Sequence, residues 1–210
     1  MIRRMLFGVV AALSVAGCDQ LVDPEGNVSQ ALGAISGPKT DARFTALVRS
    51  GQPLLQISLV ERDIQTAVVQ ETQRDGVVTW LSADGASLIT QKNMLRGTRG
   101  LEQAWLSSDI SQSLALVRSG REGTVERFHT YLDGEDQAVT RSYVCVIERR
   151  GPRETDLGAR VAQTVLMRET CRSLDDEFFN LYWVEAGTIL QTRQWAGPVV
   201  GAISTRVVLR

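Results

Sequence analysis

The chain contains a single histidine, His129, and only three cysteines, and it has no long apolar run. If Cys18 carries a lipid, as argued below, two cysteines and His129 remain, and these are too few for a structural zinc site, which takes four ligands. A serine triad would have to use His129, and no Gly-x-Ser-x-Gly motif is present. With Arg127, His129 falls on the polar side of a predicted strand, so we expect a solvated surface residue. No apolar stretch approaches the roughly 20 residues that a membrane-spanning helix requires.

An excess of one charge is also missing, since 23 basic residues face 24 acidic ones. Without a basic tract, nothing indicates a nucleic-acid partner. The only acidic cluster is residues 175–177. A glycosidase needs two carboxylates that face each other across the bond to be cleaved, whereas neighbouring side chains on a strand point to opposite sides. Glycine-rich phosphate loops are absent. We therefore predict no catalytic residues, no metal and no cofactor apart from covalent lipid.

The first 17 residues have the pattern of a secretory signal peptide. Arg3 and Arg4 precede an apolar run of about a dozen residues, a basic head followed by a short apolar segment. The run ends in Val-Ala-Gly-Cys at residues 15–18, which resembles the lipobox of bacterial lipoproteins. This resemblance implies a diacylglycerol on the Cys18 thiol and an acylated new amino terminus. The alternative is an ordinary cleaved signal followed by a coincidental cysteine.

Removal of residues 1–17, which include two arginines, leaves 193 residues with a formal charge of −3. That length suits one hydrophobic core. Residues 18–40 are small and polar, with Pro24 and Pro38, and we expect a lipidated flexible tether. Residues 41–210 would form the folded domain, and the lipid on Cys18 would be its attachment to a membrane.

Cys145 and Cys171 remain as an even pair in an oxidising compartment. Both fall on the more apolar side of predicted neighbouring strands, where a disulfide could form. The two cysteines lie 26 residues apart. Closing a loop of that size would stabilise the fold by about 3.5 kcal/mol on the chain-entropy model. The alternative is two buried free thiols.

Hydrophobic residues recur mostly with a period of two. Leu55, Ile57 and Leu59 alternate with polar residues, as in a half-buried strand, and Asp84-Gly85 marks a tight turn. Residues 101–117 instead carry apolar side chains at helical spacing, and we predict a helical insert there. The pattern predicts a mainly β chain, with one antiparallel domain of about ten strands in a barrel or sandwich.

The C-terminal segment carries the most specific motif. It runs Phe-Asn-Leu-Tyr-Trp-Val at 179–184, Gly-Thr-Ile at 187–189 and Arg-Gln-Trp-Ala-Gly-Pro at 193–198. These residues resemble the C-terminal signature of the YjbF/GfcB family of lipoproteins, encoded with exopolysaccharide and group 4 capsule genes. Thr-Arg-Gly-Leu at 98–101 resembles its central strands, and Cys171 stands where the family has its second cysteine. The resemblance covers nearly all of the mature chain.

The resemblance implies a non-catalytic, periplasm-facing lipoprotein that assists exopolysaccharide or capsule secretion. Its partners would be an outer-membrane β-barrel and periplasmic proteins of the export system, which it could contact by strand addition. The resemblance favours the outer membrane. Asp19, directly after Cys18, points instead to the inner membrane under the sorting rule of enteric bacteria.

The alternative is a periplasmic protein that binds or modifies glycan. The candidate contact residues for a glycan or a partner are Trp195, Arg193, Gln194, Tyr182 and Trp80. Arg193 would offer a fork of donors to an acidic sugar, whereas Trp183, which alternates with Phe179 and Leu181, is expected in the core. A third alternative is a general envelope-stability lipoprotein.

Overall fold

The computed structural model describes residues 41–102, 105–135 and 137–208 of the chain. The predicted signal peptide (1–17), tether (18–40) and Cys18 lie outside the described residues, so these interpretations stay predictions. Among the described residues, no helix is both long and apolar enough to cross a membrane.

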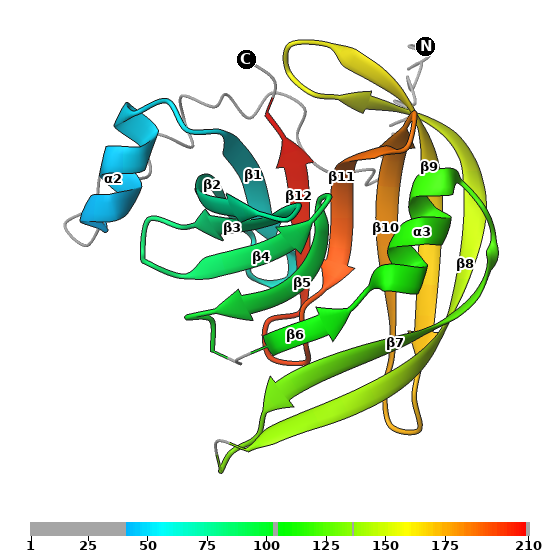
Figure 1. Ribbon diagram of the computed structural model, residues 1–210. Coiled ribbons are helices and arrows are strands. Elements are labelled where there is room, and N and C mark those ends of the chain that lie inside the picture. Colours follow the sequence, from blue (N-terminus) through cyan, green and yellow to red (C-terminus); the bar gives the residue numbers. More distant parts are fainter. Residues whose placement is uncertain (1–40, 103–104, 136, 209–210) are drawn as a thin grey trace, which may run out of the picture.

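The described residues form twelve strands in one antiparallel sheet, with two short α-helices and a 3₁₀ turn (Figure 1). The strands are β1 (Leu54–Leu59), β2 (Ile64–Arg74), β3 (Val77–Leu81), β4 (Ser87–Gln91), β5 (Met94–Arg99), β6 (Trp105–Asp109), β7 (Gly123–Leu132), β8 (Ala138–Asp156), β9 (Val161–Arg172), β10 (Glu177–Glu185), β11 (Thr188–Trp195) and β12 (Ala202–Val207). The helices are α2 (Ala42–Arg49) and α3 (Ser111–Ser119), and the turn is η1 (Val60–Arg62).

The sheet curls into a nearly closed barrel with the order β5-β4-β3-β2-β1-β12-β11-β10-β9-β8-β7-β6. Strands adjacent in sequence pair in it, apart from β5 and β6 at the two ends of the order, and β1 also pairs with β12, the first strand with the last. The first and last strands of the order, β5 and β6, meet at Gly97. A Cβ atom at Gly97 would lie 2.8 Å from the carbonyl oxygen of Trp105, so this approach requires glycine. The mainly β, barrel-like prediction is confirmed.

Alternation of apolar residues correctly places the core of the first strands. Leu55 and Ile57 in β1 are buried and pack with Val68, Trp80 and Leu88 from the next strands. Their polar neighbours face outward because successive side chains of a strand point to opposite sides.

The predicted helix over residues 101–117 is wrong in its first half, where β6 is a strand that pairs with β7. Trp105 fills the barrel interior with no exposed surface, and this burial outweighs helical spacing. Helix α3 begins only at Ser111, whose backbone N–H donates to the Asp109 carboxylate at 3.0 Å. It ends at Gly120 in the left-handed conformation, φ 65°.

Nothing in the alternation of the sequence indicates α2. Asp41 caps this helix by accepting a hydrogen bond from the backbone N–H of Arg43 at 2.7 Å. Its single fully buried residue, Phe44, packs against Leu54, Val69 and Leu81. The helix therefore covers one outer patch of the β1–β3 sheet.

The inward and outward faces of two strands are the reverse of those predicted. In β7, Arg127 and His129 are buried, whereas Phe128 is exposed. In β10 the buried residues are Phe178, Asn180, Tyr182 and Val184, and Trp183 with its alternating neighbours is only half-buried. Polar side chains enter this half of the barrel because they bond one another there, and the apolar alternates are left outside.

Candidate functional site

The barrel interior between β7 and β10 holds a buried ion pair. Arg127 from β7 donates from Nη1 to Oε2 of Glu169 from β9 at 2.5 Å, and both side chains are at most 1% exposed. Tyr182 OH and Asn180 Nδ2 from β10 also donate to Glu169 Oε2, each at 2.7 Å. Ser113 Oγ of α3 donates to Oε1 at 2.5 Å. The carboxylate is thus held by four donors from three elements, β7, β10 and α3.

These contacts keep Glu169 ionised and Arg127 charged. Burial alone would raise the pKa of Glu169, but Arg127 and the donated hydrogen bonds hold that pKa below its usual value. Burial likewise disfavours the charge of Arg127, and the carboxylate restores it, so its pKa is raised. A carboxylate saturated by donors and shielded from solvent is poorly suited to exchange protons with a substrate. Its geometry fits a structural role.

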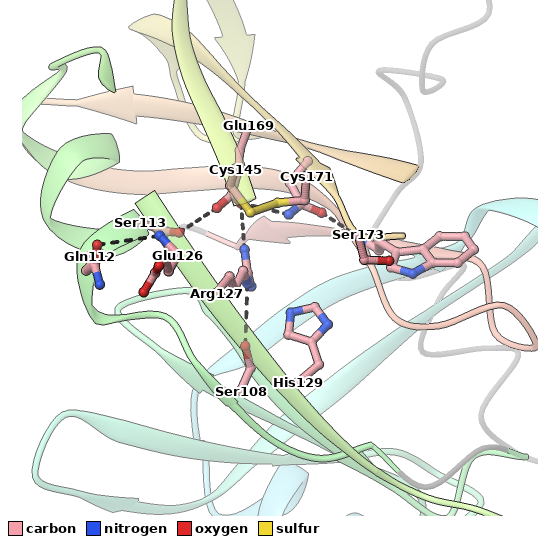
Figure 2. Close-up of a disulfide and its surroundings, with 12 residues drawn as sticks. Ser108, Gln112, Ser113, Glu126, Arg127, His129, Cys145, Glu169, Cys171 and Ser173 are labelled. Atoms are coloured by element: carbon pink, nitrogen blue, oxygen red, sulfur yellow. Dashed lines mark hydrogen bonds and ion pairs between the residues drawn. A yellow bond between two sulfur atoms is a disulfide. The ribbon is translucent and has the colours of Figure 1, made fainter. Parts of the chain in front are cut away.

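A disulfide lies directly beside this ion pair (Figure 2). Cys145 of β8 and Cys171 of β9 are directly opposite in register, with Cα atoms 4.0 Å apart, and both are fully buried. The two sulfurs and a Glu169 oxygen lie within 4.8 Å of one another. They do not suit a metal, because both sulfurs are bonded to each other and the carboxylate is occupied.

His129 lies below the ion pair in an aromatic cage (Figure 2). Its ring centroid is 4.7 Å from that of Trp105, 5.0 Å from Tyr143 and 5.6 Å from Phe178. Nδ1 is 3.0 Å from the Tyr131 hydroxyl, and Nε2 is buried without a partner. Burial first, and then the charge of Arg127, holds the pKa of His129 well below 6.5. The prediction of a solvated histidine is wrong.

The outer face of β9–β11 carries a second arrangement of charged residues. The guanidinium carbons of Arg168 (β9) and Arg193 (β11) lie 4.7 Å and 4.5 Å from the ring centroid of Phe179 (β10). We call these three residues the Arg–Phe–Arg stack. All three are half-buried, so the stack is part of the surface.

The structure distributes the five predicted contact residues between the interior and the surface. Tyr182, Gln194 and Trp80 are buried, with Tyr182 in the ion-pair network and Trp80 Nε1 donating to Thr90. Gln194 spans the interior by accepting from the Leu95 backbone N–H at 2.9 Å. Arg193 and Trp195 are half-buried, and the Trp195 ring lies 6.0 Å from that of Phe178. Only these last two remain available for a surface contact.

The sequence analysis did not predict the buried ion pair or the Arg–Phe–Arg stack. The sequence analysis did not single out Glu169, because its ion pair with Arg127 joins residues 42 positions apart in the chain. One available signal was the alternation along β7. Arg127 lies on the same side of the strand as Val125 and Tyr131, which are both buried. No comparable pattern pointed to Arg168.

Comparison with known proteins agrees with this barrel. The model of the family described as "Group 4 capsule polysaccharide lipoprotein gfcB, YjbF" matches residues 36–208. The chain belongs to the YjbF family. The family is named for a capsule lipoprotein, and its description mentions no catalytic activity.

Among solved structures, the YjbF-family barrel is similar to the hypothetical lipoprotein YmcC from Escherichia coli K12, with a TM-score of 0.67 and 17% identity. The match covers 89% of this chain and 97% of YmcC, and at this identity it establishes the shared fold. No curated protein sequence matches the chain.

Proposed function

We propose that this protein is a non-catalytic, lipid-anchored accessory of exopolysaccharide or capsule secretion that docks onto other envelope components. Family membership supports the pathway. The docking role is supported by an exposed apolar surface on β7 and β8, made of Phe128, Val144 and Val146, which are 37%, 56% and 46% exposed. We call these residues the apolar β7–β8 face. Exposed apolar patches of this kind commonly mark protein interfaces.

The proposed partners are an outer-membrane β-barrel and periplasmic proteins of the same export system. A photo-crosslinking amino acid at Val146 is expected to capture such a component in cells that make polysaccharide. The same probe at Val161, which is 57% exposed on β9, serves as the matched control. Equal capture at both positions, or normal secretion in a Val144→Lys/Val146→Lys variant that folds and localises normally, would contradict docking through this face.

The proposed anchor is lipid on Cys18, on the periplasmic side of the outer membrane. Cys18→Ala should abolish palmitate labelling and leave unprocessed precursor, since no thiol would remain at the cleavage site. Persistent labelling would exclude Cys18 as the acceptor. Membrane fractionation of the wild type and of an Asp19→Ser variant then tests sorting. A wild type found in the inner membrane would contradict the outer-membrane position, and its movement to the outer membrane in the variant would show that Asp19 retains it.

A second candidate function is direct glycan binding, favoured by the half-buried Arg193 and Trp195 on the surface. Loss of polysaccharide binding in Trp195→Ala, with unchanged thermal unfolding, would support it. Release of reducing ends from polymer by the purified protein would establish a glycan-modifying activity instead. A secretion defect with normal detergent resistance would separate both functions from general envelope stability.

A further inference from the structure

The Arg–Phe–Arg stack holds two cations near one aromatic ring on a surface with few compensating acids. Arg193 has one weak ion pair, with Nη2 3.7 Å from Glu61 Oε1. Arg168 makes no ion pair with any residue that the structure describes, and its Nε is buried without a partner. Glu148 faces Arg168 in the β8–β9 register but pairs with Arg150, at 3.8 Å.

This arrangement matches an anionic ligand. Like charges held close together repel unless an anion offsets them, and guanidinium groups bind carboxylates through paired hydrogen bonds. The Phe179 ring orients both side chains in advance through cation–π contacts, which lowers the entropy lost on binding. The stack is therefore preorganised to hold carboxylate groups.

The surface between the two arginines is apolar. Leu181 of β10 lies opposite both Arg168 and Arg193 in the strand register, and Trp183 is the next outward residue along β10. Both are half-buried, so part of each side chain remains accessible. Arg168 and Arg193 lie two strands apart, a backbone spacing on the order of 10 Å. A ligand that follows this surface from β9 to β11 passes over Leu181, so its middle would meet an apolar side chain.

We propose that this outer face of β9–β11 binds an acidic oligosaccharide, with Arg168 and Arg193 holding its carboxylates and Leu181 and Trp183 packing against its sugar rings. The inference rests on the proposed function in polysaccharide secretion and specifies the chemical class of polymer, one that carries uronate-type carboxylates. The binding surface crosses three strands, so the sugar chain would run across the strand direction.

The test is calorimetric titration of the full mature lipoprotein in detergent with hexagalacturonate, and with maltohexaose as an uncharged chain of equal length. We expect binding of hexagalacturonate that weakens as salt is added, and no measurable binding of maltohexaose. Trp183 should report the same event, with a fluorescence change on adding hexagalacturonate that is lost in Trp183→Phe. Equal binding of the two sugars, or of neither, would overturn the inference.

Variants locate the site. Arg168→Gln and Arg193→Gln should each weaken hexagalacturonate binding at least about tenfold, the effect of losing one charge-assisted hydrogen bond. Arg193→Lys should restore only part of the affinity, because an ammonium group keeps the charge but not the planar fork. The matched control is Arg172→Gln, at a 70% exposed arginine on β9 that pairs with Glu177 and lies outside the stack. An equal loss in this control would show a general charge effect and contradict the site.

Two further measurements keep the outcomes distinct. If the stack variants lose binding to phosphatidylglycerol vesicles while the wild type ignores hexagalacturonate, the surface recognises lipid headgroups and the inference fails. If hexagalacturonate does not bind, yet cells with lysines on the apolar β7–β8 face still lose secretion, the proposed docking function survives without this site. Thermal unfolding identifies any variant that does not fold, and the comparison of the two sugars on the wild type then decides.

Discussion

The barrel interior beside β1–β4 is filled by aliphatic and aromatic side chains, whereas the interior beside β7–β10 is built around an ion pair and a disulfide. In the first half, Leu55, Val68 and Leu88 pack in one cluster with Trp80 and Ile203. In the second, Arg127 and Glu169 are fully buried beside Cys145–Cys171. Apolar packing tolerates small changes, but a buried ion pair depends on both partners. The two halves should therefore respond differently to substitution, reduction and pH.

The largest effect is expected at the ion pair. Glu169→Ala should destabilise the protein by about 3–5 kcal/mol, because it leaves the Arg127 charge buried and uncompensated. Urea unfolding at pH 7 with the disulfide intact measures this loss. The double variant Arg127→Met/Glu169→Leu should be markedly more stable than Glu169→Ala, since it buries no charge. If the single variant is the more stable, the ion pair does not organise this half.

Removal of the disulfide should have the next largest effect. Cys145→Ala/Cys171→Ala opens a constraint between residues separated by 26 positions and should cost about 3.5 kcal/mol on the chain-entropy model. Unfolding curves with and without reductant provide the measurement. The reductant should shift the wild-type curve and leave the double variant unchanged, and an unshifted wild type would mean that the bond adds no stability.

Mild acid should lower the stability of the protein through the buried His129. The pKa of buried His129 lies well below its unfolded value of 6.5, so the unfolded chain binds a proton first as pH falls. Stability is fully present above pH 6.5 and should fall below it by at most about 1.4 kcal/mol per pH unit. The Glu169 pKa is lowered from 4.5, so its contribution is lost only in stronger acid.

His129→Phe tests this assignment, because it keeps an aromatic ring in the cage and cannot be protonated. Its unfolding free energy should change less between pH 7 and pH 5 than that of the wild type. The lost hydrogen bond to Tyr131 lowers stability equally at both values, so it does not affect the slope. Parallel pH profiles for the two proteins would show that another group titrates.

The smallest effect is expected in the apolar half. Ile57→Val removes one methylene group from a 5% exposed residue of β1 and should cost about 0.5–1.5 kcal/mol at any pH between 5 and 7. Its unfolding curve should shift by the same amount under oxidising and reducing conditions. A pH-dependent or redox-dependent cost would mean that the two halves are coupled more tightly than their separate clusters indicate.

The sequence alone determined the β-rich architecture and the core positions of β1, because alternation and turn residues act locally and leave a direct pattern in the chain. It made Cys145 and Cys171 the expected pair, and the register of β8 and β9 places them opposite each other in a disulfide. Only the tertiary structure decided which face of β7 and β10 is buried. Apolar Phe128 and Trp183 lie outside the barrel, while Arg127 and Tyr182 lie inside it. The physical reason is that a charged residue is buried only when an opposite charge and hydrogen bonds compensate it. For Arg127 the compensating residue is Glu169, which lies 42 positions away in the chain. The Arg–Phe–Arg stack arose in the same way, since strand register alone brings Arg168 and Arg193 to one ring.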